Sequence, residues 1–122
     1  MGLGSILVAE DDAEVRSLIC LALEHAGFTV RAVSDGATAL QELKSHPVDL
    51  LISNLRMPRL DGRELLNRIR TDKALSDLPV LVVSGYVDTI PLPHLPNAVI
   101  VKPFDPHELV RVASELIDAA AA

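Results

Sequence analysis

Residues 48–54 read VDLLISN, and this segment gives the clearest indication of how the chain folds. Four of the six residues 48–53 are apolar and three of these are consecutive, which is typical of a strand buried on both faces in the centre of a parallel sheet. Three other short runs rich in Val and Ile lie at residues 6–9, 80–83 and 99–101, and helical patterns separate them. This alternation predicts an α/β fold in which helices cover both faces of a parallel sheet.

Aspartates and prolines set limits to the expected helices. Each expected helix opens on an aspartate, a residue type that caps helix N-termini. These residues are Asp12, Asp35, Asp61 and Asp105. Residues 29–33 alternate between polar and apolar side chains, as an edge strand would. The three prolines in the segment 86–96 disfavour a regular helix, because each costs roughly 3 kcal/mol in a helix interior, and at most one turn is expected at 87–90.

Length and charge exclude several classes of protein. With 122 residues the chain can form one domain with its own core. A net charge of −6 argues against direct contact with nucleic acid, which needs clustered Lys and Arg. No apolar stretch approaches the roughly 20 residues of a membrane span. Cys20 is the only cysteine, so no disulfide forms, and a cytoplasmic location is expected.

Polar side chains follow four of the expected strands, at the point where each strand ends. The acidic cluster 10–12 follows the first strand, Asn54 the third, Ser84 the fourth and Lys102 the fifth. The carboxyl ends of parallel strands meet at one edge of the sheet, where ligands of such folds bind. Adjacent carboxylates at this edge repel each other unless a cation binds, and Mg²⁺ prefers one or two carboxylates with water and phosphate oxygens.

Each of these residues also has a purely structural explanation. Capping of the first helix explains Asp11 and Asp12 equally well, and Asp12 is assigned to that role alone. Ser84 and Lys102 are, taken singly, ordinary residues at strand ends. They become informative as an ordered set, in which an acid, an amide, a hydroxyl and an ammonium group follow four strands of one sheet.

With this ordered set and the sequence Lys102-Pro103, residues 5–118 resemble the receiver domain of bacterial two-component response regulators. The resemblance implies a flavodoxin-like, doubly wound sheet of five parallel strands in the order 2-1-3-4-5, with a fourth helix that is shortened or irregular here. It also implies that residues 1–122 form a single receiver domain. In that family, position 54 holds the aspartate that accepts a phosphoryl group from a histidine kinase.

The resemblance also implies a magnesium site at the strand ends. Asp11 is the expected direct ligand, Glu10 acts through a water molecule, and Arg56 offers its backbone carbonyl. Asn54 cannot form an acyl phosphate, because an amide is a poor nucleophile. Its side-chain oxygen is a weaker metal ligand than a carboxylate, so Mg²⁺ is expected to bind weakly if at all.

The same resemblance assigns a phosphoryl-binding and switch role to residues of the last two strands. Ser84 is expected to hydrogen-bond a phosphoryl group. Lys102 is expected to pair with a phosphoryl oxygen, aimed by a cis peptide bond before Pro103. Val99 stands where the family typically has a Tyr or Phe that rotates inward, and the proline-rich segment 86–96 alters the usual output surface.

The leading hypothesis is a receiver domain that is not an enzyme and signals through protein–protein contacts without accepting phosphate. Its expected partners are a histidine kinase or phosphotransfer protein and a downstream output protein or domain, and a homodimer remains open. The alternative is a competent phosphoryl acceptor in which Asn54 is an introduced substitution. A flavin or nucleotide carrier is excluded, because the chain has no Gly-rich phosphate loop after the first strand and no aromatic residue to stack a flavin.

Overall fold

The computed structural model describes residues 3–85 and 94–121. Its five strands pair in parallel in the order β2-β1-β3-β4-β5, which confirms the predicted α/β sheet and its strand order. The strands are β1 (Ser5–Ala9), β2 (Thr29–Val33), β3 (Leu50–Ser53), β4 (Val80–Ser84) and β5 (Ala98–Val101). The helices are α1 (Ala13–His25), α2 (Gly36–Ser45), α3 (Gly62–Thr71) and α4 (Pro106–Ala121).

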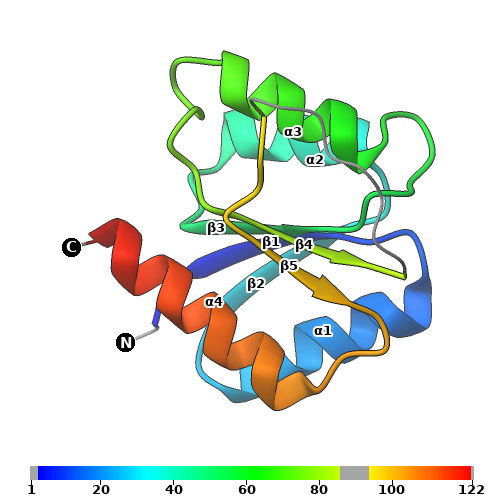
Figure 1. Ribbon diagram of the computed structural model, residues 1–122, viewed down its shortest axis with the longest axis vertical. Helices are drawn as coiled ribbons and strands as arrows, with labels where there is room; N and C mark the ends of the chain where they lie inside the picture. Colours follow the sequence, from blue (N-terminus) through cyan, green and yellow to red (C-terminus); the bar gives the residue numbers. More distant parts are fainter. Residues whose placement is uncertain (1–2, 86–93, 122) are drawn as a thin grey trace.

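The helices form a layer on each face of the sheet. Figure 1 shows α2 and α3 on one face and α1 and α4 on the other. Because side chains alternate along a strand, β1 sends Ile6 and Val8 into the core beneath α1 and α4, and Leu7 and Ala9 into the core beneath α2 and α3. All four side chains are almost fully buried, which explains why the central strands are continuous apolar runs.

Local capping follows the predicted aspartates. Asp12 accepts hydrogen bonds from the backbone N–H groups of Glu14 and Val15, and Asp35 and Asp61 cap α2 and α3 in the same way. Asp105 accepts the N–H of His107 in the first turn of α4. These bonds span two or three residues, which is why the helix starts can be predicted from the sequence.

The central strand is shorter than the apolar run predicts. β3 begins at Leu50 rather than at Val48. Asp49 instead ties the start of β1, because its carboxylate accepts the backbone N–H of Ser5 over 2.8 Å, and its own N–H donates to the Ser5 carbonyl over 2.8 Å.

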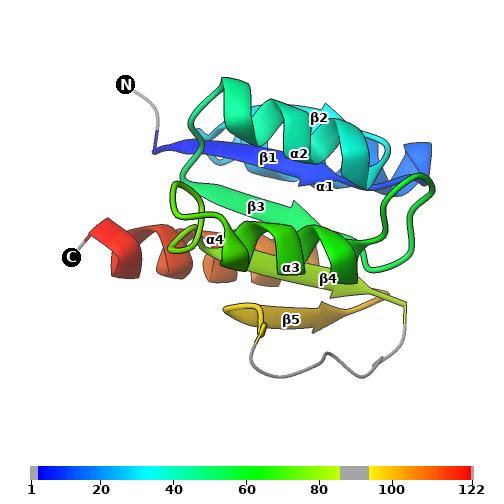
Figure 2. The same cartoon turned by 90° about the horizontal axis from the view of Figure 1, so that it is seen from above.

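The β4–β5 connection carries no helix in its described parts, Gly85 and residues 94–97. The turn expected at residues 87–90 lies outside the described residues. Figure 2 shows that neither α2 nor α3 extends over β5. Val99 and Val101 project from β5 on the face of the sheet that α2 and α3 cover elsewhere, and they are 46% and 43% exposed. Ile100 is buried in the core beneath α1 and α4.

Within the described residues, no helix has the length and apolar character needed to cross a bilayer.

Close backbone packing fixes the loop between β3 and α3. A Cβ atom on Gly62 would lie 2.2 Å from the carbonyl oxygen of Asn54, so only glycine fits there. The N–H of Gly62 donates to the Leu55 carbonyl over 2.8 Å. A Cβ atom on Gly36 would lie 1.9 Å from the Leu60 carbonyl oxygen. The loop is therefore pressed against both β3 and the start of α2, at the carboxyl edge of the sheet.

Candidate functional site

Backbone hydrogen bonds hold the carboxyl ends of neighbouring strands in contact just beyond the regular sheet. The N–H of Asn54 donates to the Ala9 carbonyl over 3.0 Å, and the N–H of Lys102 donates to the Ser84 carbonyl over 2.6 Å. These bonds place the residues that follow β1, β3, β4 and β5 along one edge. The parallel topology thus brings these strand ends to the same edge of the sheet, as the sequence predicts.

Glu10 is the most enclosed charged residue of this edge. It is 1% exposed, and its Oε1 atom lies 2.7 Å from the ammonium nitrogen of Lys102. Its Oε2 atom accepts the backbone N–H of Asp12 over 3.1 Å and an N–H of the Asn54 side chain over 3.1 Å. Both carboxylate oxygens are therefore hydrogen-bonded, as a buried charge requires.

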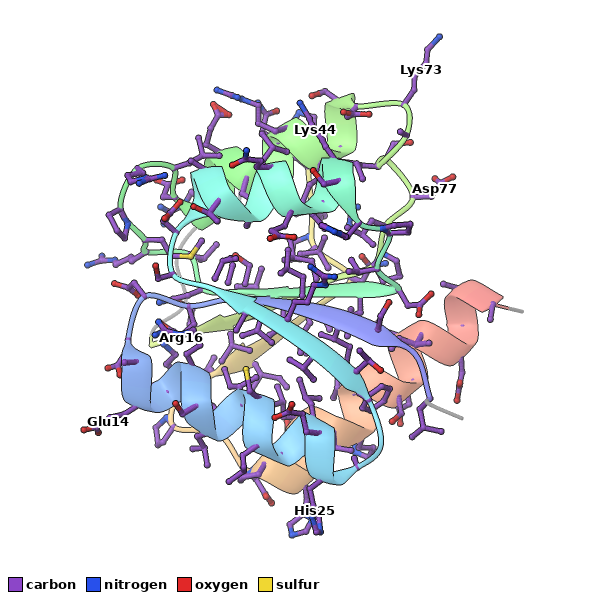
Figure 3. The ribbon with its side chains drawn as sticks, turned by 180° about the vertical axis from the view of Figure 1, so that it is seen from behind. Glu14, Arg16, His25, Lys44, Lys73 and Asp77 are labelled. Carbon is purple, nitrogen blue, oxygen red and sulfur yellow. The ribbon has the colours of Figure 1, made fainter. Side chains whose placement is uncertain are left out.

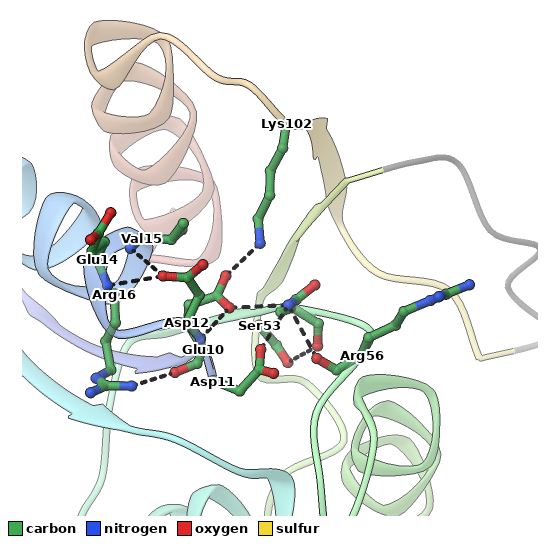
Figure 4. Close-up of polar contacts among 10 residues, drawn as sticks. Glu10, Asp11, Asp12, Glu14, Val15, Arg16, Ser53, Arg56 and Lys102 are labelled. Atoms are coloured by element: carbon green, nitrogen blue, oxygen red, sulfur yellow. Dashed lines mark hydrogen bonds and ion pairs between the residues drawn. The ribbon is translucent and has the colours of Figure 1, made fainter.

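Arg16 is a site residue that the sequence analysis missed. Its guanidinium donates to the Glu10 carbonyl over 2.9 Å. Figure 3 shows Arg16 between α1 and the sheet, whereas Glu14 of the same turn points outward. Its position six residues after Glu10, in the first part of α1, could have suggested that it reaches back to the strand end. Figure 4 shows the whole cluster, with Lys102 on the opposite side of Glu10.

Asn54 links the end of β1 to the loop after β3 through its side-chain nitrogen. The Nδ2 atom donates to Glu10 Oε2 over 3.1 Å, to Asp11 Oδ1 over 3.3 Å and to the carbonyl of Arg56 over 3.2 Å. The residue is 8% exposed. Rotating the amide by 180° would place its oxygen against three other oxygens, so the hydrogen-bond network fixes the orientation.

The remaining predicted residues occupy different positions relative to this cluster. Ser84 is 3% exposed at the end of β4, and the Lys102–Pro103 peptide bond is cis, as the sequence resemblance implies. Asp12 caps α1, as expected. Val99 pairs in register with Val82 on β4 and is half-exposed, so it is not part of the polar cluster.

A second polar cluster lies at the start of α2, where the capping role of Asp35 is predicted from the sequence but its contact with Arg59 is not. Asp35 accepts the backbone N–H of Thr38 over 2.7 Å and its hydroxyl over 3.0 Å. Arg59, which adopts a positive φ of 70°, lies 3.6 Å from the same carboxylate. The pKa of Asp35 is lowered, chiefly because its carboxylate accepts the N–H of Thr38. Burial opposes this shift, and the Thr38 hydroxyl and the Arg59 charge add to it.

Comparison with known proteins identifies the family. Residues 6–114 match the model of the response regulator receiver domain. The chain belongs to this family. The receiver protein CpdR of Brucella abortus is 34% identical over 119 residues, which cover 94% of this chain and 98% of CpdR. The receiver domain of the Francisella response regulator 1452 superposes with a TM-score of 0.86 at 28% identity, covering 95% of this chain and 98% of that one.

Other relatives carry a receiver domain as part of a longer protein. The transcriptional regulatory protein GltR of Pseudomonas aeruginosa is 34% identical over 95% of this chain, but the chain spans only 50% of GltR. Receiver domains take phosphoryl groups from histidine kinases and pass the signal to output domains. They generally bind Mg²⁺ at the acceptor site.

The side chains at the strand ends of this receiver domain do not fit Mg²⁺ as they are arranged. Mg²⁺ needs oxygen ligands in near-octahedral geometry. Glu10, Asp11 and the Arg56 carbonyl present oxygens, but Asn54 presents its nitrogen-bound hydrogens to the same three atoms. In the described residues, no group of three or more His, Cys, Asp or Glu side chains is arranged to hold a metal ion.

Proposed function

We propose that this receiver domain takes part in two-component signalling without accepting a phosphoryl group, because Asn54 occupies the acceptor position. The position of Asn54 supports this proposal. It follows the central strand β3 directly, and its side chain contacts Glu10 and Asp11 at the carboxyl edge of the sheet. Glu10 in turn pairs with Lys102, the residue proposed to bind phosphoryl oxygens.

The chemistry of the amide argues against phosphoryl transfer. An acyl phosphate forms when a carboxylate oxygen attacks phosphorus, and Asn54 has no such oxygen. Its nitrogen lone pair is delocalised into the carbonyl group, and both of its N–H bonds point at acceptors. We therefore propose that the domain is not an enzyme and that its output depends on protein–protein contacts.

An exposed apolar groove supports a role in protein contacts. It lies between α1 and α4, with a volume of about 780 Å³. Leu18 and Leu21 of α1 are 47% and 68% exposed beside it, and Val110 of α4 contributes to its lining. Exposed apolar patches of this kind are typical of interaction surfaces. The proposed partners are a histidine kinase or phosphotransfer protein and a downstream output protein or domain.

Phosphoryl labelling tests the proposed function. Purified protein is incubated with acetyl phosphate and Mg²⁺, and its intact mass is measured before and after mild base. The expected result is no base-labile phosphoryl adduct. The Asn54→Asp variant is the matched comparison, and it should gain the adduct if Ser84 and Lys102 bind phosphoryl oxygens as proposed. A base-labile adduct on the Asn54 protein would overturn the proposal.

The second candidate function is phosphoryl acceptance by a native aspartate, with Asn54 as an introduced substitution. The presence of the other residues that the resemblance assigns to phosphoryl binding favours this second candidate. The ammonium nitrogen of Lys102 lies 2.7 Å from the Glu10 carboxylate, and Ser84 ends the neighbouring strand. Sequencing codon 54 of the native gene separates the two candidates. The expected cytoplasmic location and the single domain at residues 1–122 remain part of the proposal.

A further inference from the structure

Asn54 is held in place by hydrogen bonds of its backbone as well as by those of its side-chain amide. Its N–H donates to the Ala9 carbonyl over 3.0 Å, and its own carbonyl accepts the Ser53 hydroxyl over 2.9 Å. Gly62 packs against the same carbonyl group. The backbone therefore cannot move away from the acidic cluster without breaking the β1–β3 edge, and only rotation of the side chain can change what the amide presents.

The amide nitrogen donates to the oxygens that the resemblance assigns to a cation site, those of Asp11 and the Arg56 carbonyl as direct ligands and that of Glu10 through water. Glu10 Oε2, Asp11 Oδ1 and the Arg56 carbonyl oxygen all lie between 3.1 and 3.3 Å from Nδ2. These atoms come from the end of β1 and from the loop after β3. Without a donor between them, the two carboxylates and the carbonyl would repel one another across this edge.

The charge balance of the cluster also differs from that of a three-carboxylate site. Asn54 leaves the carboxylates of Glu10 and Asp11 against the ammonium group of Lys102, which lies 2.7 Å from Glu10. An aspartate at position 54 would add a third negative charge, and a divalent cation would then be needed to offset it. With the amide at position 54, its N–H groups offset part of the negative charge of Glu10 and Asp11 by hydrogen bonding.

We infer that the Asn54 amide replaces the divalent cation of the receiver site as a permanent hydrogen-bond donor. It holds the end of β1 and the β3–α3 loop, residues 55–61, in one arrangement whether or not Mg²⁺ is present. The inference deepens the proposed function and rests on it, because it takes position 54 as the acceptor position. The domain is thereby made insensitive to Mg²⁺ as well as to phosphoryl donors.

Binding of Mg²⁺ would require the amide to turn its oxygen inward. That rotation breaks all three hydrogen bonds of Nδ2 and exchanges them for one neutral ligand. Even the loss of a residue that only supports metal ligands lowers affinity by about 10- to 100-fold. We therefore expect the Asn54 protein to bind Mg²⁺ at least about 100-fold more weakly than its Asn54→Asp variant.

Hydrogen exchange of backbone amides in residues 55–61 tests the inference. Three proteins are compared in EDTA and in excess Mg²⁺: the Asn54 protein, Asn54→Asp and Asn54→Ala. The Asn54 protein should exchange at the same rate in both conditions. Asn54→Asp should exchange roughly tenfold faster in EDTA and recover in Mg²⁺, since one net hydrogen bond is worth about that factor. Asn54→Ala should exchange faster in both.

Asn67→Asp is the matched control. Asn67 also donates its side-chain N–H to a carboxylate, that of Glu64 over 3.0 Å, but within α3. Its replacement should leave exchange in residues 55–61 unchanged and without response to Mg²⁺. The inference is overturned if Mg²⁺ slows exchange in the Asn54 protein as much as in Asn54→Asp, or if Asn54→Ala matches the Asn54 protein in EDTA.

A measurement on the unmodified chain covers the case in which a variant does not fold. Mn²⁺ is added to the Asn54 protein, and paramagnetic broadening of backbone amide resonances is recorded. Selective broadening at Glu10, Asp11 and Arg56 would overturn the inference, and its absence supports it. Phosphoryl labelling gives an independent result, because an adduct on the Asn54 protein refutes the proposed function, whereas metal binding without an adduct refutes only the inference.

Discussion

The side-chain amide of Asn54 donates a hydrogen bond over 3.1 Å to the carboxylate of Glu10, a residue 44 positions earlier in the chain. Both residues are buried, and each directly follows a strand of the sheet centre. The contact joins the ends of the two strands at the carboxyl edge of the sheet, where we propose the acceptor position to lie. Replacing Asn54 removes this hydrogen bond, so the free energy of unfolding should depend on the residue at position 54.

Asn54→Asp should lower the free energy of unfolding by about 0.5–2 kcal/mol at neutral pH in EDTA. The substitution removes a donor shared by three acceptors and places a carboxylate about 3 Å from two others. Denaturation by urea, monitored by circular dichroism, measures the difference. Mg²⁺ should narrow the gap, because a ligand stabilises the state that binds it. Equal stability in EDTA would show that the three side chains do not share one site.

The Asn54 contact also shows where prediction from sequence ends. The capping aspartates act on N–H groups two or three residues away, so the sequence alone was enough to place Asp12, Asp35 and Asp61. The grouping of Glu10 with Lys102 followed from the parallel strands. The orientation of the Asn54 amide does not follow in this way, because the resemblance predicts that its oxygen faces a cation, whereas its nitrogen faces Glu10 in the structure. That orientation depends on acceptors brought together only by the tertiary fold.

The Asp35 carboxylate should contribute to stability in a pH-dependent way. Its pKa is lowered in the folded state, chiefly by the N–H of Thr38, so the contribution is fully present above the unfolded pKa of about 3.9 and is lost as pH falls through the lower folded value. Asp35→Asn keeps a capping oxygen but removes the charge. It should cost about 0.5–1 kcal/mol at neutral pH.

Urea denaturation of both proteins at pH 7 and near pH 3 measures this contribution. The gap between them should shrink at the lower pH, because pH 3 lies below the unfolded pKa of about 3.9, where the unfolded carboxyl group binds a proton. Arg59→Gln is the control, and its free energy of unfolding should differ little from that of the unmodified protein. The Arg59 side chain is 67% exposed, and an ion pair of 3.6 Å with an exposed partner contributes little to stability. A gap that stays constant with pH would contradict the role of the charge.

Arg70 should be the most sensitive arginine of α3. Its guanidinium donates to the Leu78 carbonyl over 2.7 Å and to Asn97 Oδ1 over 2.8 Å, and the same Asn97 atom accepts the N–H of Val80 over 2.8 Å. It thus connects α3 to the chain segments that enter β4 and β5. The sequence could not predict these contacts, because Asn97 is 27 positions away and no short motif marks the pair.

Arg70→Ala should lower the free energy of unfolding by about 2–3 kcal/mol, because it removes several hydrogen bonds from partly buried acceptors. Arg70→Lys should recover only part of this loss, since an ammonium group cannot reproduce the planar fork. Arg68→Ala is the matched control on the same helix. Arg68 is half-exposed and 3.9 Å from Glu64, so its loss should stay within about 0.5 kcal/mol. Equal effects of the two alanine variants would argue against the connecting role.

The last prediction concerns Val99 and the transmission of a signal through β5. In the Asn54→Asp variant bound to beryllofluoride, a mimic of the phosphoryl group, we expect amide chemical shifts to change near position 54, Ser84 and Lys102. They should change little across the rest of residues 97–112. The reason is that Val99 is a β-branched aliphatic residue, 46% exposed on the outer face of β5. It has no ring that could rotate inward behind Ser84, and its side chain has few rotamers to exchange.

Introducing Val99→Tyr into the Asn54→Asp background provides the comparison. A tyrosine at the same outward-facing position has both the volume and the rotational freedom to move between an exposed and an inward arrangement. Beryllofluoride should then shift resonances across residues 97–112 more widely than in the single variant. If the single variant already shows wide changes over these residues, another element relays the signal and Val99 does not limit it. If the double variant gains nothing, the position is not coupled to Ser84, because a ring alone is then insufficient to link the strand ends to the exposed face of β5.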